Sequence, residues 1–209
     1  MPRRNLHLLS TLLFPISFIP WVLGGEFIIH TVYVLLFYLL LPALIVKALG
    51  FELKEFGLRL PNGRGLRFFA ALFLLSIPLS LYGTKVPSMR EYYPIFTYSG
   101  WGDFFLMELV MGAIMLAHEA FYRGFLLFPL ARKNEWLAVI LQDIPYTLVH
   151  IGKPGIEVPY AFVAGIIFAK MDLEGESFLP SFLLHWLGSA FFDFLCVAVK
   201  SGLLSFALP

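Results

Sequence analysis

The chain has little charge, one cysteine and no cluster of basic residues. Only 14% of its 209 residues are Asp, Glu, Lys or Arg, and the formal net charge is +1. A single cysteine excludes an intrachain disulfide framework, and the apolar run around Cys196 is typical of a small buried hydrophobe. Because no basic patch or tail is present, we do not expect nucleic acid as a partner. The sequence also contains no internal repeat and no low-complexity tract.

Apolar residues, in contrast, are abundant. They make up 59% of the chain, and the mean hydropathy is +0.82. A soluble domain of this size would have to expose much of that apolar surface to water. A lipid bilayer tolerates such a composition. The sequence therefore predicts a single integral membrane domain over residues 1–209, in contact with the bilayer.

Seven apolar runs divide the chain. A helix needs roughly 20 apolar residues to cross the hydrocarbon core, and four or five of the runs meet that length comfortably. We expect an all-α fold, a polytopic transmembrane bundle of about seven helices. The sixth run is short and is expected to be a thin, tilted or partly re-entrant span. The expected spans are 6–24, 27–49, 66–83, 104–130, 136–151, 158–171 and 178–199.

The placement of Lys and Arg predicts the orientation of these spans. The first run, after Arg3 and Arg4, is long for a signal peptide and ends in no small-x-small cleavage pattern, so it is read as a membrane helix. With the N-terminus in the cytoplasm, and with Arg123 set aside as intramembrane, ten basic residues lie on the inner side and four on the outer side. The inner residues are Arg3, Arg4, Lys47, Lys54, Arg59, Arg64, Arg67, Arg132, Lys133 and Lys170, and the outer ones are Lys85, Arg90, Lys153 and Lys200. We therefore expect a cytoplasmic N-terminus.

Two connecting segments have compositions that suit a membrane surface. Residues 51–61 mix charged and apolar residues at helix-like spacing, so this segment is expected to lie along the cytoplasmic interface. Residues 84–102 carry three tyrosines and a tryptophan, which suits the outer headgroup level.

Ionisable residues inside apolar runs are costly, and the fourth run contains several of them. Glu119 and Arg123 are four residues apart, so they share a helix face and can form an ion pair. Glu108 lies on the same stripe, which is therefore expected to face protein rather than lipid. His118 points about 100° away from Glu119 and can address a common cavity from another direction. A purely structural ion pair that holds two helices together is the competing interpretation.

The fifth and seventh runs add two more histidines. Asp143, Tyr146 and His150 fall near one face of the fifth run, although a lone histidine near a helix end is often only interfacial. In the seventh run, His185 is followed by Ser189 at i+4 on a stripe of small and polar residues that suits helix packing. Ser189 has no G-x-S-x-G surroundings that would indicate a nucleophile.

The histidines are stronger evidence for a functional site when the fourth, fifth and seventh runs are considered together. Each of three long runs within residues 104–199 carries a histidine at membrane depth, and one adds a glutamate and an arginine. Glu119, His150 and His185 converging in one cavity could activate a water molecule and stabilise the resulting oxyanion. The pattern therefore favours hydrolysis within the membrane, with residues 104–199 as the region that bears the site.

These residues resemble the motifs of the CPBP intramembrane proteases, which include the CAAX prenyl endopeptidases and the bacteriocin-processing "Abi" proteins. That family is marked by Glu-Glu-x-x-x-Arg, Phe-x-x-x-His and His-x-x-x-Asn on separate membrane helices. The counterparts here are His118-Glu119-x-x-x-Arg123, Tyr146-x-x-x-His150 and His185-x-x-x-Ser189. Residues 56–61 are also similar to a common lead-in of the family, so the resemblance covers about residues 51–192. Each motif is short, but their order and spacing are specific together.

The resemblance implies an intramembrane endopeptidase that hydrolyses a peptide bond of a membrane-associated or lipidated substrate. In this interpretation Glu119 and His118 activate water, His150 assists, His185 and Ser189 bind the oxyanion, and Arg123 holds Glu119. A glutamate-type mechanism implies no cofactor. The chain departs from the family in having His118 for the first Glu, Ser189 for the Asn and Tyr146 for the Phe.

The departure at His118 leaves three arrangements open. Glu119 could be the base with His118 orienting it, or His118 could itself be the base, since a neutral imidazole works well near pH 7. Alternatively, His118, His150 and His185 could bind zinc beside Glu119, although the chain lacks H-E-x-x-H and this arrangement ranks third.

Two other functions compete with a protease. A catalytically inactive relative could use the same fold as a membrane-embedded binding protein, as the His118 and Ser189 departures suggest. A small transporter could use Glu108, Asp143 and Asp193 as a proton path. No pair of spans is broken in matching halves, as inverted-repeat transporters would show, so the transporter ranks last.

Overall fold

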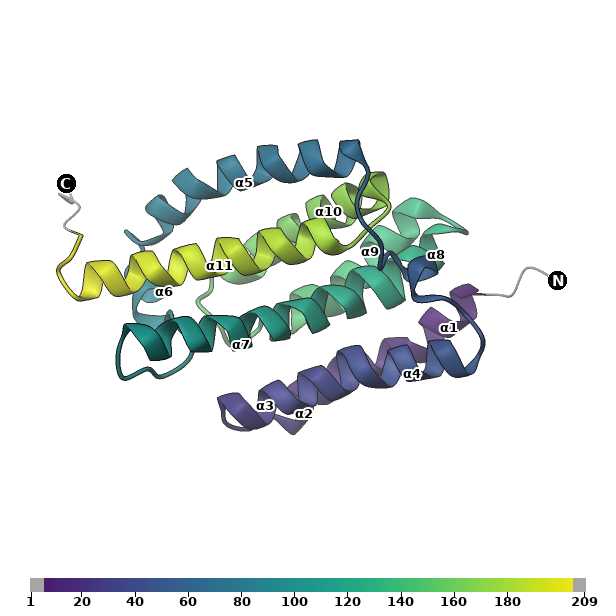
Figure 1. The fold of residues 1–209 in the computed structure, drawn as a ribbon, viewed down its shortest axis with the longest axis horizontal. Coiled ribbons are helices and arrows are strands. Elements are labelled where there is room, and N and C mark those ends of the chain that lie inside the picture. The colour runs from purple at the N-terminus through teal and green to yellow at the C-terminus, as the bar shows by residue number, and fades with distance from the viewer. Residues whose placement is uncertain (1–5, 205–209) are drawn as a thin grey trace.

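In the computed structural model, which describes residues 6–204, all seven apolar runs form helices, and this part of the chain contains no strand (Figure 1). The helices pack antiparallel into an elongated bundle, so the prediction of an all-α fold is confirmed. The elements of the first half are α1 (Leu6–Leu13), η1 (Phe14–Phe18), α2 (Ile19–Leu23), α3 (Phe27–Val34), η2 (Leu35–Leu40), α4 (Leu41–Ala48), η3 (Leu53–Phe56) and α5 (Gly63–Gly83). Those of the second half are α6 (Pro87–Tyr92), α7 (Trp101–Glu119), η4 (Ala120–Leu127), α8 (Phe128–Ala131), α9 (Glu135–Leu148), α10 (Glu157–Gly175) and α11 (Leu179–Lys200).

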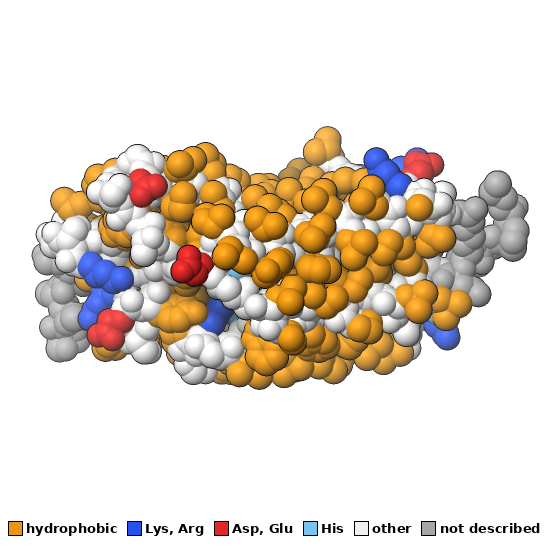
Figure 2. All heavy atoms as spheres, turned by 90° about the horizontal axis from the view of Figure 1, so that it is seen from below, with side chains coloured by type: hydrophobic (Ala, Val, Ile, Leu, Met, Phe, Trp, Pro, Cys, Tyr) orange, Lys and Arg blue, Asp and Glu red, His pale blue; other side chains and the backbone are white. Residues whose placement is uncertain are grey.

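Five continuous helices are long and apolar enough to cross a bilayer. They are Leu6–Leu23, Phe27–Ala48, Gly63–Gly83, Trp101–Ala131 and Leu179–Lys200. Leucines and valines on their outer faces are exposed, which is the expected arrangement when lipid is the solvent. Figure 2 shows that apolar side chains cover most of the middle of one face, while Lys and Arg lie mainly toward the ends of the long axis. This distribution matches a membrane-embedded bundle with polar surfaces at both ends.

The fifth and sixth runs form helices that do not belong to these five. Helix α9 has 14 residues, fewer than the roughly 17 that a span requires. Helix α10 has 19 residues, but charged residues lie at both of its ends, at Glu157, Lys170, Asp172 and Glu174. The count of seven spans stays a prediction for these two segments. Arg3 and Arg4, which contribute to the predicted orientation, lie outside the described residues.

Helices α7 and α11 run side by side at the centre of the bundle (Figure 1). Helix α5 packs against the other side of α11, and α9 and α10 pair behind them. Close approach of α7 and α11 depends on Gly112, because a Cβ at this position would lie 2.6 Å from Trp186. This contact brings the polar residues of α7 within reach of those on α11.

The helix that starts with α7 changes its winding at the predicted site. After Glu119 the chain continues for eight residues as the π-helical segment η4, in which every residue is buried. π-helical turns are rare and often occur at functional sites. Helical periodicity alone did not predict this change.

The segment 51–61 contains only one short 3-10 helix, η3, rather than a longer interfacial helix. Its first turn is closed by reciprocal contacts between Glu52 and Glu55, and Gly57 then adopts the left-handed conformation at φ 79°. Phe56 is only 1% exposed, and it anchors the segment in the core. Helix-like spacing over these residues therefore reflects packing of Phe56 rather than a continuous helix.

Candidate active site

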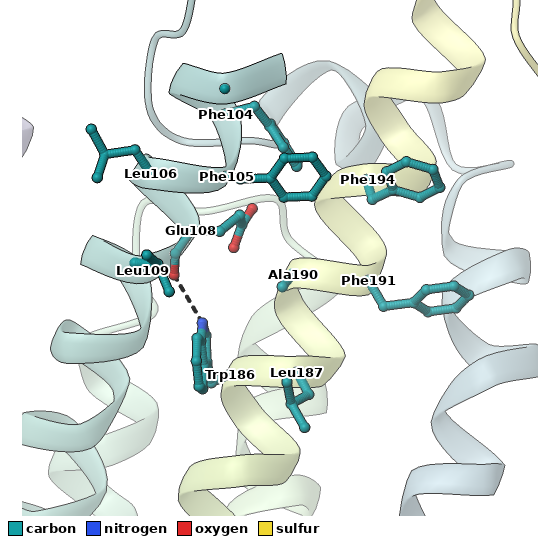
Figure 3. Close-up of a pocket in the computed structure, with 11 residues that line it drawn as sticks. Phe104, Phe105, Leu106, Glu108, Leu109, Trp186, Leu187, Ala190, Phe191 and Phe194 are labelled. Atoms are coloured by element: carbon teal, nitrogen blue, oxygen red, sulfur yellow. Dashed lines mark hydrogen bonds between the residues drawn. The ribbon is translucent and has the colours of Figure 1, made fainter. Parts of the chain in front are cut away.

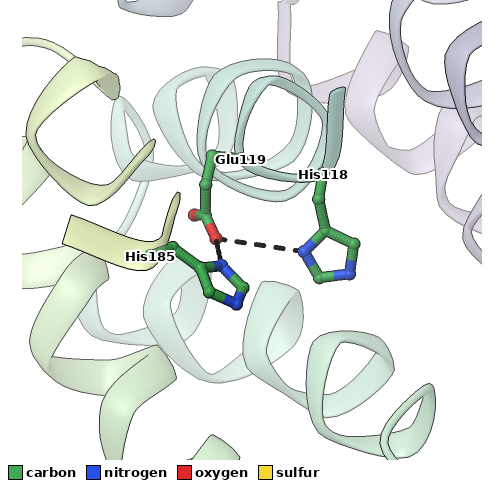
Figure 4. A group of neighbouring side chains, drawn as sticks. All are labelled: His118, Glu119 and His185. Atoms are coloured by element: carbon green, nitrogen blue, oxygen red, sulfur yellow. Dashed lines mark hydrogen bonds and ion pairs between the residues drawn. The ribbon is translucent and has the colours of Figure 1, made fainter. Parts of the chain in front are cut away.

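Glu119 is fully buried on α7 and receives a hydrogen bond from α11. Its side chain has 0% exposure, and Oε1 lies 2.7 Å from Nδ1 of His185 (Figure 4). A carboxylate oxygen can only accept, so His185 donates from Nδ1–H and keeps Nε2 free in its neutral form. The two predicted residues therefore meet directly, across the contact between α7 and α11.

Arg123 holds the other oxygen of the Glu119 carboxylate. Its Nε lies 3.3 Å from Glu119 Oε2, and both side chains are 0% exposed. The predicted i,i+4 ion pair is therefore present. The guanidinium also donates from Nη1 to Gln142 Oε1 and lies 4.1 Å from the centre of the Tyr146 ring. A buried charge needs such partners, because desolvation of an unpaired guanidinium is costly.

His118 faces Glu119 from the neighbouring position on the helix. Its Nδ1 lies 3.9 Å from Glu119 Oε1, which is too far for a direct hydrogen bond (Figure 4). This Nδ1 is buried and has no hydrogen-bond partner among the described residues. The His118 side chain is 13% exposed and that of His185 is 16% exposed, so both rings extend from the buried carboxylate toward the protein surface. The predicted offset of about 100° thus directs His118 and Glu119 toward a common space.

His150 approaches the same space from the end of α9. Its ring centre lies 6.3 Å from that of His118, and its Nδ1 lies 2.8 Å from the carbonyl oxygen of Tyr146. The carbonyl accepts, so Nδ1 carries the hydrogen and Nε2 is free. At about 1.5 Å per residue, α9 is only about 21 Å long, shorter than the hydrocarbon core of about 30 Å. The short helix explains how a residue near its end can lie beside His118.

Ser189 has no such contact. It is half-buried, one turn after His185 on α11, and its Oγ makes no hydrogen bond to any residue within 6–204. Its role stays a prediction. Tyr146, by comparison, is 2% exposed and packs between Arg123 and the rings of His118 and His150.

The sequence pattern did not predict the role of Gln142 or the packing of Asp143. Gln142 is fully buried and accepts from Arg123, while its Nε2 donates to the Val139 carbonyl over 2.9 Å. The side-chain amide of Gln142 within an apolar run was the signal that could have identified this residue. Asp143 is also buried but lies against Gly165 of α10, where a Cβ would come within 1.7 Å of its Oδ1.

The donor atoms of His118, Glu119 and His185 are close enough to hold a metal ion. One ligand atom from each lies within 4.8 Å of the others, the only such group of three or more found within residues 6–204. His150 is not part of this group, so a set of three histidines stays a prediction. Nitrogen and carboxylate donors suit zinc, but Arg123 on the same carboxylate places a fixed positive charge beside the position of an ion.

Comparison with known proteins gives a family match for this part of the chain. Residues 99–191 match the family model described as type II CAAX prenyl endopeptidase Rce1-like. The matched residues include Glu119, Arg123, His150 and His185, whereas residues 51–61 lie outside the match. No curated protein and no solved structure matches the chain. The family match confirms the resemblance to the CAAX-type proteases, and together with the five apolar helices it supports an integral membrane protein.

Proposed function

We propose, from the match of residues 99–191 to the Rce1-like CAAX protease family model, that the protein is an intramembrane endopeptidase acting on a prenylated or otherwise membrane-associated peptide. The observation that carries the proposal is the buried Glu119 carboxylate, held by Arg123 and His185 with His118 and His150 around the same space. Fixed charges and donors in a site of low dielectric constant are what hydrolysis of a peptide bond requires.

The attacking water is best placed between His118 and Glu119. Two acceptors 3.9 Å apart can both take a hydrogen bond from one water molecule. Glu119 already accepts a hydrogen bond from His185 through Oε1 and forms an ion pair with Arg123 through Oε2, whereas Nδ1 of His118 makes no hydrogen bond. We therefore assign His118 as the proton acceptor and Glu119 as the carboxylate that orients the water and stabilises the imidazolium.

The remaining residues then have complementary roles. The water oxygen attacks the scissile carbonyl carbon, and the proton taken by His118 passes to the leaving nitrogen as the C–N bond breaks. Nε2 of His150 is free to accept a hydrogen bond from the scissile N–H. Nε2 of neutral His185 is likewise an acceptor, so the hydroxyl of Ser189 is assigned as the donor to the oxyanion. The products are a new carboxylate and a free amine.

Cleavage of a defined peptide tests the function. The purified chain in nanodiscs is incubated with a farnesylated peptide and with the same peptide lacking the lipid. We expect cleavage of the lipidated peptide, and loss of at least about 100-fold in rate for Glu119→Ala and His150→Ala. His30→Ala and Glu91→Ala are matched controls, because both residues lie outside the site. If both site variants cleave as fast as the parent, the assignment is wrong.

A stable complex with a membrane protein but no cleavage would favour the binding-protein alternative.

Zinc hydrolysis is the second candidate mechanism. It is motivated by the convergence of donor atoms from His118, Glu119 and His185. These three residues would hold the ion, which would polarise the substrate carbonyl and activate water when bound. Arg123 opposes this arrangement, so we rank it below the mechanism without a metal.

A further inference from the structure

A groove lies between α7 and α11, and none of the site histidines lines it. Its volume is about 670 Å³, within the usual range of pockets for small molecules. Aromatic and aliphatic side chains line it, among them Phe104, Phe105, Trp186 and Phe194 (Figure 3). Glu108 is the only ionisable residue in the lining.

The Glu108 carboxyl group is buried at this groove without an adequate partner. The residue is 6% exposed, and its side chain points into the space between the two helices (Figure 3). The carboxyl group of Asp193, a residue only 1% exposed, faces it from α11. No other group in residues 6–204 donates a hydrogen bond to either oxygen of Glu108 or to Oδ1 of Asp193. Two carboxyl groups buried together in this way are unfavourable unless a proton or a cation lies between them.

The basic residues nearest to this pair are engaged elsewhere. Lys200 donates to the carbonyl oxygen of Tyr93 over 2.6 Å. Lys153 forms an ion pair with Glu157 at 3.5 Å. No lysine or arginine of the described chain forms an ion pair with Glu108 or Asp193. The pair therefore lacks an internal counter-ion.

From these features we propose that the groove binds an apolar molecule that carries one ammonium group. Glu108 and Asp193 sharing one proton would present a single negative charge, which matches a single ammonium. The aromatic rings of the lining can contact both the cation and its alkyl chain. A calcium ion would need six to eight oxygen ligands, which an apolar lining does not offer.

The groove is separate from the site of hydrolysis. Glu108 precedes Glu119 by 11 residues, about 16 Å along a helix. Its own backbone carbonyl accepts a hydrogen bond of 2.8 Å from Nε1 of Trp186, which lines the groove. Trp186 therefore supplies a fluorescence signal at this site, and Trp101 packs against the lining residues Phe104 and Phe194 from outside the groove. The proposal does not depend on the proposed protease activity.

Binding of dodecylamine by the parent chain in nanodiscs of zwitterionic lipid tests the proposal. Dodecanol has the same chain without the charge, and empty nanodiscs correct for partitioning into lipid. We expect the amine to change tryptophan fluorescence at concentrations at least about tenfold lower than the alcohol, and Trp186→Phe to reduce the change. Equal responses to amine and alcohol would show an apolar groove without a cation site and would overturn the proposal.

Two variants extend the test to the acid pair. Glu108→Gln and Asp193→Asn are expected to reduce amine binding to the level of dodecanol. Glu91→Gln, an exposed acid on α6, should leave binding unchanged, which separates the groove from general attraction to surface charge. Thermal unfolding of each variant checks that it is folded. Folded variants that bind the amine as tightly as the parent would overturn the proposal. If a variant does not fold, the comparison of amine with alcohol in the parent chain still tests the proposal.

Discussion

His185 on α11 and Glu119 on α7 meet at 2.7 Å, 66 residues apart in the chain. The contact fixes the orientation of both side chains, because Nδ1–H of His185 donates to a carboxylate that Arg123 also holds. The carboxylate, imidazole and guanidinium thus form one unit that joins two helices in the interior of the bundle.

Removal of the imidazole of His185 should impair the site more than it impairs the fold. For His185→Ala we expect cleavage to fall about 100-fold or more, because Glu119 loses the donor that fixes the orientation of its carboxylate beside the water. The ion pair with Arg123 remains, so the free energy of unfolding should fall by only about 1–3 kcal/mol. Peptide cleavage and thermal unfolding measured on the same sample check both. Unchanged cleavage would show that His185 has only a structural role.

Substitution of His118 tests the assignment of the base. His118→Glu creates the Glu-Glu-x-x-x-Arg pattern of the family, and we expect it to retain cleavage, whereas His118→Ala should lose about 100-fold. A carboxylate stays unprotonated at lower pH than an imidazole does, so the rate of His118→Glu should persist further into acid. The pH–rate profiles of parent and variant provide the measurement. Full activity of His118→Ala would instead favour Glu119 as the base.

Gln142 should act as a positioning residue. Gln142→Leu removes the acceptor from Nη1 of Arg123, and the cost of the unsatisfied donor is about 1–3 kcal/mol of stability. Because Arg123 orients Glu119, we also expect kcat to fall about tenfold with little change in KM. Gln142→Glu retains an acceptor and should recover most of the rate. If Gln142→Leu loses stability but keeps kcat, the residue is structural only.

Two glycines on neighbouring helices offer a matched test of packing. A Cβ on Gly165 would lie 1.7 Å from Asp143 Oδ1, whereas a Cβ on Gly188 would meet nothing within 4 Å. We expect Gly165→Ala to destabilise the protein by about 1–3 kcal/mol through overpacking. Gly188→Ala should be neutral or stabilising by up to about 1 kcal/mol, since alanine favours helix. Chemical or thermal unfolding in detergent measures both, and equal effects would contradict the packing of α9 on α10.

Metal removal separates the two proposed mechanisms. With His118 as the base, protein treated with 1,10-phenanthroline and then freed of the chelator should cleave at the parent rate. Elemental analysis should find no stoichiometric zinc. Loss of cleavage that is restored by added zinc, but not in Glu119→Gln, would instead assign His118, Glu119 and His185 as ligands.

Much of the fold and part of the site could be predicted from local periodicity. Long apolar runs predicted membrane helices because hydrocarbon length and helical rise are constant. The four-residue spacing of Glu119 and Arg123 predicted their ion pair for the same reason, since neighbours within a helix depend on the helix alone.

The acidic residues inside the apolar runs show what helical periodicity could not predict, namely their partners on other helices. Glu108, Asp143 and Asp193 were grouped as one proton path, but Glu108 faces Asp193 while Asp143 packs against Gly165 of α10. A helix face can be calculated from the sequence, whereas the helix that covers it depends on packing. For the same reason, the sequence did not predict the contact of Gln142 with Arg123 or the π-helical segment after Glu119.

The sequence by itself therefore determined a membrane-embedded helical protein with a buried Glu119–Arg123 pair and three histidines at depth. Only the tertiary structure decided that His185 donates to Glu119, that Nδ1 of His118 makes no hydrogen bond, and that the short α9 brings His150 beside them. The reason is that spacing along one helix is set by local geometry. Contacts between helices instead depend on close approach at positions such as Gly112 and Gly165, which is decided by packing across the whole bundle.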